Sequence, residues 1–183
     1  MLEGEGFDLG RVPVELRGLA REQIAAGRVL GCLGLVDNMV TPLFVADNIR
    51  ALRAAGVYEQ AVLDALNGVR VNFSGMRWLP GLLLHFADPV RLRAAGAPLP
   101  GPGPFTVYRG VAGRGAARWV RGLFWTGSIE RARWFAQRFA ELGDPAVFTV
   151  TVTEAEVLAH VKCRDEDEYL VRVPPRVRPR RVA

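Results

Sequence analysis

The sequence contains few of the residue types that most often carry chemistry in proteins. Cysteine occurs only at Cys32 and Cys163, and histidine only at His85 and His160. The cysteines are far apart and form no CxxC motif, so neither a disulfide framework nor a zinc site is expected. We therefore expect reduced thiols, as in a cytoplasmic protein, and no bound metal.

Long apolar runs are also missing. The best candidate, residues 79–87, falls short of the roughly 18 to 20 apolar residues that a membrane span needs, and His85 interrupts it. The acidic start, residues 1–5, has no apolar core, which predicts no Sec-type signal. With 183 residues, half of them hydrophobic, the chain is long enough to bury a core and is not expected to be disordered. No membrane partner is expected.

Lysine is nearly absent, because every basic residue except Lys162 is arginine. The net charge of +5 favours attraction to phosphates or to an acidic partner. Alanine, glycine, valine, leucine and arginine are abundant together, as a GC-rich coding bias would produce. The charge alone is therefore only a weak indication of nucleic-acid binding.

Helical patterns dominate the first hundred residues, and no chemical motif occurs there. Residues 1–12 are predicted to be a poorly ordered leader, and Gly56 is predicted to end a helix. The alternating prolines and glycines of residues 97–104 predict a linker, beyond which the pattern changes to that of strands. The helices are expected over residues 13–29, 43–55, 58–66 and 82–95, the last interrupted at Asp88-Pro89.

The clearest candidate for a binding residue is Arg109. Residues 105–111 alternate with period two, which places Arg109 on the apolar face of a strand. A buried guanidinium requires a carboxylate or a phosphate, so Arg109 is expected either to bind a phosphate or to pair with an acidic residue near the end of the chain. Gly110 would allow a ligand to approach the backbone closely.

The pattern beyond Arg109 alternates between strands and a helix. A short strand is expected over residues 122–126, and Ser128 is expected to cap a helix that runs to about residue 142. Further strands are expected over residues 146–153 and 157–163, and His160 within the latter is expected to be structural. The helix carries a predicted core stripe of Ala132, Phe135, Ala136, Phe139 and Ala140.

Four consecutive acidic residues, 165–168, lead directly into an apolar run. The plain interpretation is a solvated acidic turn before an edge strand. The alternative is a pair of carboxylates, Glu166 and Glu168. They would share one face if the strand begins early, as paired acid and base groups would require.

These pieces, in this order, resemble the mono-ADP-ribosyltransferases of the Arg-Ser-Glu class, the toxin-like branch that uses NAD. The similarity covers about residues 104–173. It depends on Tyr108-Arg109-Gly110, on a strand that ends at Thr126 before a helix with Trp-Phe-Ala, and on Glu-x-Glu. It implies an α+β fold with a helical N-terminal region (1–100) packed on a small split β-sandwich (101–174) that holds the NAD cleft. A flexible arginine-rich tail (175–183) is expected to follow.

The resemblance implies a role for each matching residue. Arg109 would bind the NAD phosphates, and Gly110 would hold the nicotinamide carboxamide with its backbone. Glu168 would be the catalytic glutamate. Glu166 would face the acceptor, expected to be arginine on a protein. Tyr108, which precedes Arg109 in the motif, is grouped with the NAD-binding residues.

The sequence departs from the family at one point. Trp125, or Phe124 if the register slips, replaces the first serine of the family's Ser-Thr-Ser strand. The hydroxyl that orients Glu168 would then come from Thr126 or Ser128, or be missing. Three other functions stay open: an NAD glycohydrolase, a nucleic-acid ADP-ribosyltransferase, and a non-enzymatic basic module in which Arg109 and Glu168 form a structural salt bridge. A bacterial or phage toxin or effector is the expected setting.

Overall fold

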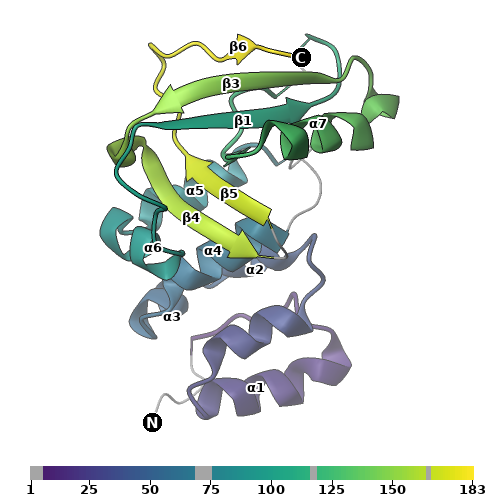
Figure 1. Cartoon of the computed structure of the whole chain (residues 1–183). Helices are drawn as coiled ribbons and strands as arrows, with labels where there is room; N and C mark the ends of the chain where they lie inside the picture. Colours follow the sequence, from purple (N-terminus) through teal and green to yellow (C-terminus); the bar gives the residue numbers. More distant parts are fainter. Residues whose placement is uncertain (1–5, 69–75, 116–118, 164–165) are drawn as a thin grey trace. The chain divides into compact units, whose positions relative to one another are not determined.

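The computed structural model describes residues 6–68, 76–115, 119–163 and 166–183 (Figure 1). The chain divides into two compact units, residues 1–95 (unit 1) and 96–183 (unit 2). Within the described ranges, no helix is both long enough and apolar enough to span a membrane. The division falls just before the segment rich in proline and glycine.

In the described residues of unit 1, 6–68 and 76–95, the regular elements are all helices. The expected break at Asp88-Pro89 separates α5 from α6. The 3-10 helices are η1 (Val14–Leu16) and η2 (Val29–Leu35). The α-helices are α1 (Arg17–Ala25), α2 (Thr41–Asp47), α3 (Ile49–Ala54), α4 (Tyr58–Gly68), α5 (Leu79–Phe86) and α6 (Pro89–Ala95).

The end of α3 confirms the expected glycine stop. Gly56 has a φ of 73°, a left-handed conformation that glycine adopts without steric cost. The Val57 amide donates to the Leu52 carbonyl at 3.0 Å, and the Gly56 amide donates to the Arg53 carbonyl at 3.0 Å. These two bonds form a Schellman motif, which turns the chain sharply into α4.

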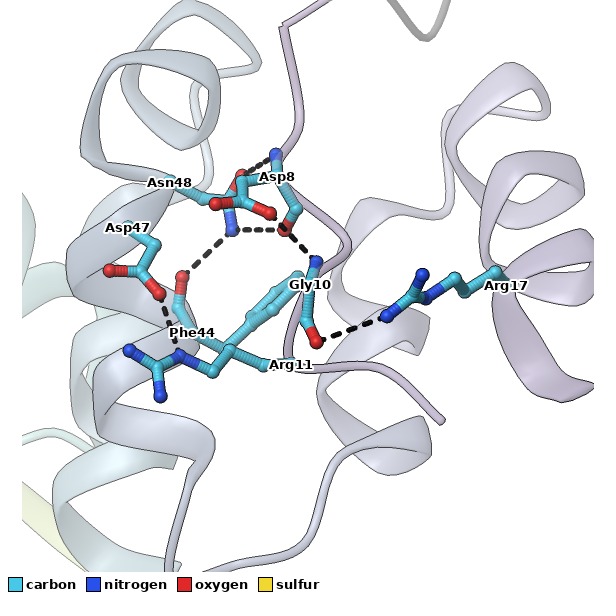
Figure 2. Close-up of polar contacts among 7 residues, drawn as sticks. All are labelled: Asp8, Gly10, Arg11, Arg17, Phe44, Asp47 and Asn48. Carbon is cyan, nitrogen blue, oxygen red and sulfur yellow. Dashed lines mark hydrogen bonds and ion pairs between the residues drawn. The ribbon is translucent and has the colours of Figure 1, made fainter. Parts of the chain in front are cut away.

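The leader is better ordered than the sequence predicts from residue 6 onward. Asn48, buried between α2 and α3, accepts a hydrogen bond from the Asp8 amide at 2.6 Å and donates to the Asp8 carbonyl at 2.9 Å (Figure 2). Arg11 forms an ion pair with Asp47 at 2.8 Å, and Val12 is buried. These partners lie about 36 to 40 positions apart, so local composition does not reveal them.

Tyr58, at the start of α4, carries a polar group into the core of unit 1. Its side chain is fully buried, and its hydroxyl donates to the Leu83 carbonyl at 2.8 Å. Burial, with a further contribution from the charge of Glu59, raises the pKa of Tyr58 to about 12. The phenol therefore keeps its proton in the folded state at pH values where an exposed tyrosine loses it.

Tyr58 should make the stability of unit 1 depend on alkaline pH. Between pH 10 and about 12 the folded state binds more protons than the unfolded state, so the free energy of unfolding should fall across that range and be unaffected below it. Tyr58→Phe should remove this dependence. It should also cost about 1–3 kcal/mol near neutral pH, because the Leu83 carbonyl loses its donor. Urea unfolding across the alkaline range tests this, and equal pH dependence in both proteins would contradict it.

Unit 2 is an α+β unit with an open antiparallel sheet of six strands, which confirms the expected fold class at this level. The strand order is β4-β5-β2-β1-β3-β6. Strand β1 has the expected bounds, and Ser128 caps α7 by accepting a hydrogen bond from the Arg131 amide at 3.1 Å. The elements are β1 (Phe105–Val111), β2 (Phe124–Thr126), α7 (Ile129–Arg138), η4 (Ala140–Leu142), β3 (Ala146–Val152), η5 (Glu154–Glu156), β4 (Val157–Cys163), β5 (Glu166–Val171) and β6 (Arg180–Arg181).

The two faces of the sheet carry different cores. On one face, α7 packs on β1 and β3, with Ala132 and Ala136 buried against Val147 (Figure 1). Ala140, predicted to continue the stripe, is exposed because α7 ends at Arg138. The opposite face buries a second cluster, made of Val107, Trp125, Val150, Val152, Val157, Tyr169 and Val171.

The C-terminal segment differs from the flexible tail that the sequence predicts. Strand β6 pairs with β3, and the Val182 amide donates to the Val147 carbonyl at 2.8 Å. Upstream of β6, the Arg121 guanidinium donates to the carbonyls of Pro174, Pro175 and Val177. One arginine thus holds the segment that leads from β5 to β6.

Candidate functional site

Strands β1, β2 and β5 bring three of the predicted site residues into one row. Tyr108 is the register partner of Thr126, and Thr126 is the register partner of Glu168. Paired residues of antiparallel strands project to the same face of a sheet. Tyr108 packs on the cluster beneath α7, so this row lies on the α7 face.

Arg109 leaves β1 on the opposite face and reaches the ends of neighbouring segments. Its Nε donates to the Trp119 carbonyl at 3.2 Å, and its Nη1 donates to the Phe124 carbonyl at the start of β2. The guanidinium therefore ties β1 to β2 and to the loop before it. This contact with backbone carbonyls is a partner type that the sequence analysis did not consider.

The charge of Arg109 is coupled to that of Glu168. Burial lowers the pKa of Arg109 to about 10, and the negative charge of Glu168 offsets part of this shift. The guanidinium remains protonated at neutral pH, because about 10 is well above 7. Arg109 and Glu168 are thus electrostatic neighbours, although they leave their strands on opposite faces.

Two glycines make room for this arrangement. A Cβ on Gly110 would lie 1.9 Å from the Ala132 carbonyl oxygen and 2.7 Å from the Ala136 nitrogen, both in the backbone of α7. A Cβ on Gly122 would lie 2.2 Å from Nη2 of Arg109. Gly110 is therefore required for close packing of α7 on β1, and Gly122 for the guanidinium of Arg109.

The structure distinguishes the two hydroxyls that could orient Glu168. Oγ1 of Thr126 accepts a hydrogen bond from the Ser128 amide at 3.2 Å, which uses a lone pair and leaves its hydrogen able to donate. The Ser128 hydroxyl lies 3.0 Å from a carboxylate oxygen of Glu130, which can only accept. The Ser128 hydroxyl therefore donates its single hydrogen to Glu130 and accepts a hydrogen bond from the Arg131 amide as the cap of α7. Thr126 is the better placed of the two.

Trp125 has a different position from the serine that it replaces in the family pattern. Its side chain is buried in the cluster opposite α7, and its indole nitrogen donates to the Gly122 carbonyl at 2.9 Å. Because Trp125 pairs with Tyr169, it lies on the face away from Glu168. A side chain at position 125 therefore projects away from Glu168.

The Glu-x-Glu motif lies inside a strand rather than before one. Strand β5 begins at Glu166, which pairs with Cys163 of β4, and Glu168 pairs with Val161. Strand β5 therefore begins early enough to include both glutamates. The first acidic residue of the run, Asp165, lies outside the described residues.

A contact that the sequence analysis missed involves Asp167, between the two glutamates. Its Oδ1 lies 2.6 Å from Nε2 of His160, and Nδ1 of His160 lies 2.7 Å from the Pro98 carbonyl. The His160 side chain is completely buried, as its expected structural role requires. The available signal was the alternation of β4 and β5, which places His160 and Asp167 on one face once the two strands are paired.

The described residues contain no cluster of three or more His, Cys, Asp or Glu side chains that could hold a metal ion. Comparison of the chain with protein-family models, with curated proteins and with solved structures gives no match.

Proposed function

We propose that this chain is an NAD-dependent mono-ADP-ribosyltransferase whose unit 2 is a compact split β-sandwich of that class. The observation that carries the proposal is the row in which Thr126 of β2 is the register neighbour of Glu168 of β5, with Arg109 following Tyr108 of the same row in β1. A carboxylate, a hydroxyl and a cation are the groups that the Arg-Ser-Glu resemblance assigns to NAD. In this chain they come from β5, β2 and β1 in that order.

The proposed reaction breaks the bond between the nicotinamide nitrogen and C1′ of the ribose. The bonding electron pair leaves with nicotinamide, and positive charge develops on the ribose ring, as in glycoside hydrolysis. Glu168 would stabilise that charge and bind the ribose 2′-hydroxyl. A guanidine nitrogen of the acceptor would then bond to C1′ and release its proton to Glu166.

Arg109 would supply the positive charge for the pyrophosphate of NAD. With a pKa of about 10 it is charged at neutral pH, and charged donors bind phosphate strongly. Its bonds to the carbonyls of Trp119 and Phe124 fix the guanidinium, so little side-chain entropy would be lost on binding. Arginine on a protein is the proposed acceptor. Water in its place would make the same site an NAD glycohydrolase.

A non-enzymatic basic module is the second candidate, and the distribution of charge favours it. Residues 96–183 contain 14 of the 24 basic and 9 of the 19 acidic residues, a net charge of +5, whereas residues 1–95 contain ten of each. The whole excess of positive charge therefore lies in unit 2. The same asymmetry would suit an enzyme that modifies nucleic acid. A binding module would show affinity that falls steeply with salt and no response to NAD.

The test is the release of nicotinamide from NAD by the purified chain, with and without cell lysate as acceptor. It is repeated in two variants, one lacking the Thr126 hydroxyl and the other lacking the Ser128 hydroxyl, to distinguish their roles. Thr126→Val should slow release about 10- to 100-fold, as expected when a charged group loses one hydrogen bond. Ser128→Ala should instead lower the free energy of unfolding by about 1 kcal/mol through loss of the helix cap. Absence of release and of NAD binding in the wild type would refute the proposed enzyme, and equal loss in the two variants would refute the assignment of Thr126.

A further inference from the structure

On the face of β5 opposite Glu168, Asp167 is held by a chain of contacts through His160 to Pro98, which we call the clamp. The Asp167 carboxylate meets Nε2 of the buried His160 at 2.6 Å, and His160 in turn meets the Pro98 carbonyl at 2.7 Å. Asp167 is 45% exposed, whereas His160 is 0% exposed, so the contact runs from the protein surface into the core. It links β5 to β4 and to the segment that precedes β1.

Both ring nitrogens of His160 face groups that accept hydrogen bonds. The Pro98 carbonyl can only accept, and an ionised Asp167 carboxylate can only accept. Both short contacts are satisfied together when Nδ1 donates to the Pro98 carbonyl and one hydrogen lies between Nε2 and Oδ1 of Asp167. Hydrogen bonds at both ring nitrogens fix the orientation of the imidazole, and with it the position of the Asp167 carboxylate.

Tyr169 and Gly127 complete the clamp. The Tyr169 ring stacks on the His160 ring, with centroids 4.8 Å apart and an interplanar angle of 29°. A Cβ on Gly127 would lie 3.1 Å from Oδ2 of Asp167, so the residue that follows Thr126 leaves space for this carboxylate. The Gly127 amide points to the Asp167 carbonyl at 3.4 Å. Asp167 thus contacts β4 and the residue that follows β2, on either side of β5.

We propose that Asp167 is a positioning residue, which acts through His160 to hold the part of β5 that presents Glu168. This inference rests on the proposed function. Asp167 directly precedes Glu168 in the strand and projects to the other face, so fixing one side chain fixes the backbone direction of the next. Catalytic carboxylates must be held within about half an ångström of their working position, which gives such a clamp an effect on rate.

The experiment compares Asp167→Asn and His160→Gln with Thr149→Val as the matched control. Thr149 donates to the Val107 carbonyl at 3.0 Å, so its replacement removes a buried hydrogen bond from the same sheet without touching β5. Both clamp variants should lower kcat for nicotinamide release about 10-fold and leave KM for NAD within about twofold, as loss of orientation predicts. Thr149→Val should lose stability and keep the wild-type kcat.

Amide hydrogen exchange provides a readout that does not depend on activity. Protection of the Glu168 and Tyr169 amides should fall more than tenfold in Asp167→Asn at a temperature where the rest of unit 2 keeps its protection, and should be unchanged in Thr149→Val. An active wild type with unchanged kcat in both clamp variants would overturn the positioning role. An inactive wild type would overturn the proposed function, and unchanged β5 protection would separately overturn the clamp.

Discussion

Replacement of Glu168 by glutamine is expected to lower the rate of nicotinamide release at least about 100-fold, the scale of effect when a group that stabilises transition-state charge is removed. Glutamine keeps the size of the side chain and its place opposite Thr126, but it cannot balance positive charge on the ribose. The measurement is kcat for release at saturating NAD, with folding checked by circular dichroism. Glu141→Gln, an exposed glutamate of η4, is the control and should keep the wild-type rate.

The other glutamate of β5, Glu166, is expected to act in transfer of ADP-ribose to the acceptor and not in cleavage of NAD. Glu166→Gln should retain release of nicotinamide to water and lose transfer to agmatine, a small guanidine acceptor, because the proposed role of Glu166 is to take the acceptor's proton. If Glu168→Gln cleaves NAD as fast as the wild type, the assignment of the catalytic carboxylate is wrong. Loss of NAD cleavage in Glu166→Gln would instead show that Glu166 also takes part in cleavage, which contradicts the separate roles proposed for the two glutamates.

Replacement of Gly110 by alanine should destabilise unit 2 by about 3 kcal/mol or more, at or beyond the upper end for overpacked cores. The added methyl would meet the Ala132 carbonyl at 1.9 Å, and backbone atoms of a helix cannot move aside as the end of a flexible side chain can. Either α7 must lift from β1 or β1 must bend. Both changes expose the cluster that α7 covers.

Gly101→Ala is the matched control for this experiment, because no atom lies within 4 Å of the position of its Cβ. It should change the free energy of unfolding by no more than about 0.5 kcal/mol. Three of the four tryptophans lie in unit 2, so tryptophan fluorescence during urea unfolding reports mainly on this unit. A midpoint for Gly110→Ala equal to that of Gly101→Ala would contradict the packing argument.

Local patterns were sufficient to predict the elements of unit 2 around the site. Period-two alternation located β1 with its bounds, and the Ser128 cap located the start of α7, because both signals depend on neighbours within four residues. The placement of Arg109 on the apolar face followed from the same alternation. Its carbonyl partners did not, since Trp119 lies 10 residues away in a loop without a pattern of its own, and Phe124 lies 15 residues away at the start of β2.

The features that the sequence did not reveal depend on pairings between distant segments. The Asp167–His160 contact requires knowledge that β4 and β5 are neighbours, and the Pro98 contact joins positions 62 residues apart. Asn48 holds the leader from 40 residues away. Strand β6 has only two residues, too few for any periodicity, so the arginine-rich composition alone suggested a flexible tail.

The segments that lie along the outer edges of β3 and β4 have a consequence for association between copies of the chain. An exposed strand edge offers unpaired backbone groups to which a strand from another molecule can add. Strand β6 and the last two residues occupy the outer edge of β3. At the other end of the sheet, the Ala97 amide donates to the His160 carbonyl of β4 at 2.7 Å, and the prolines that follow have no amide hydrogen to donate. Addition of a strand from another molecule to β3 or β4 would first have to displace one of these segments, which hinders aggregation through these two strands.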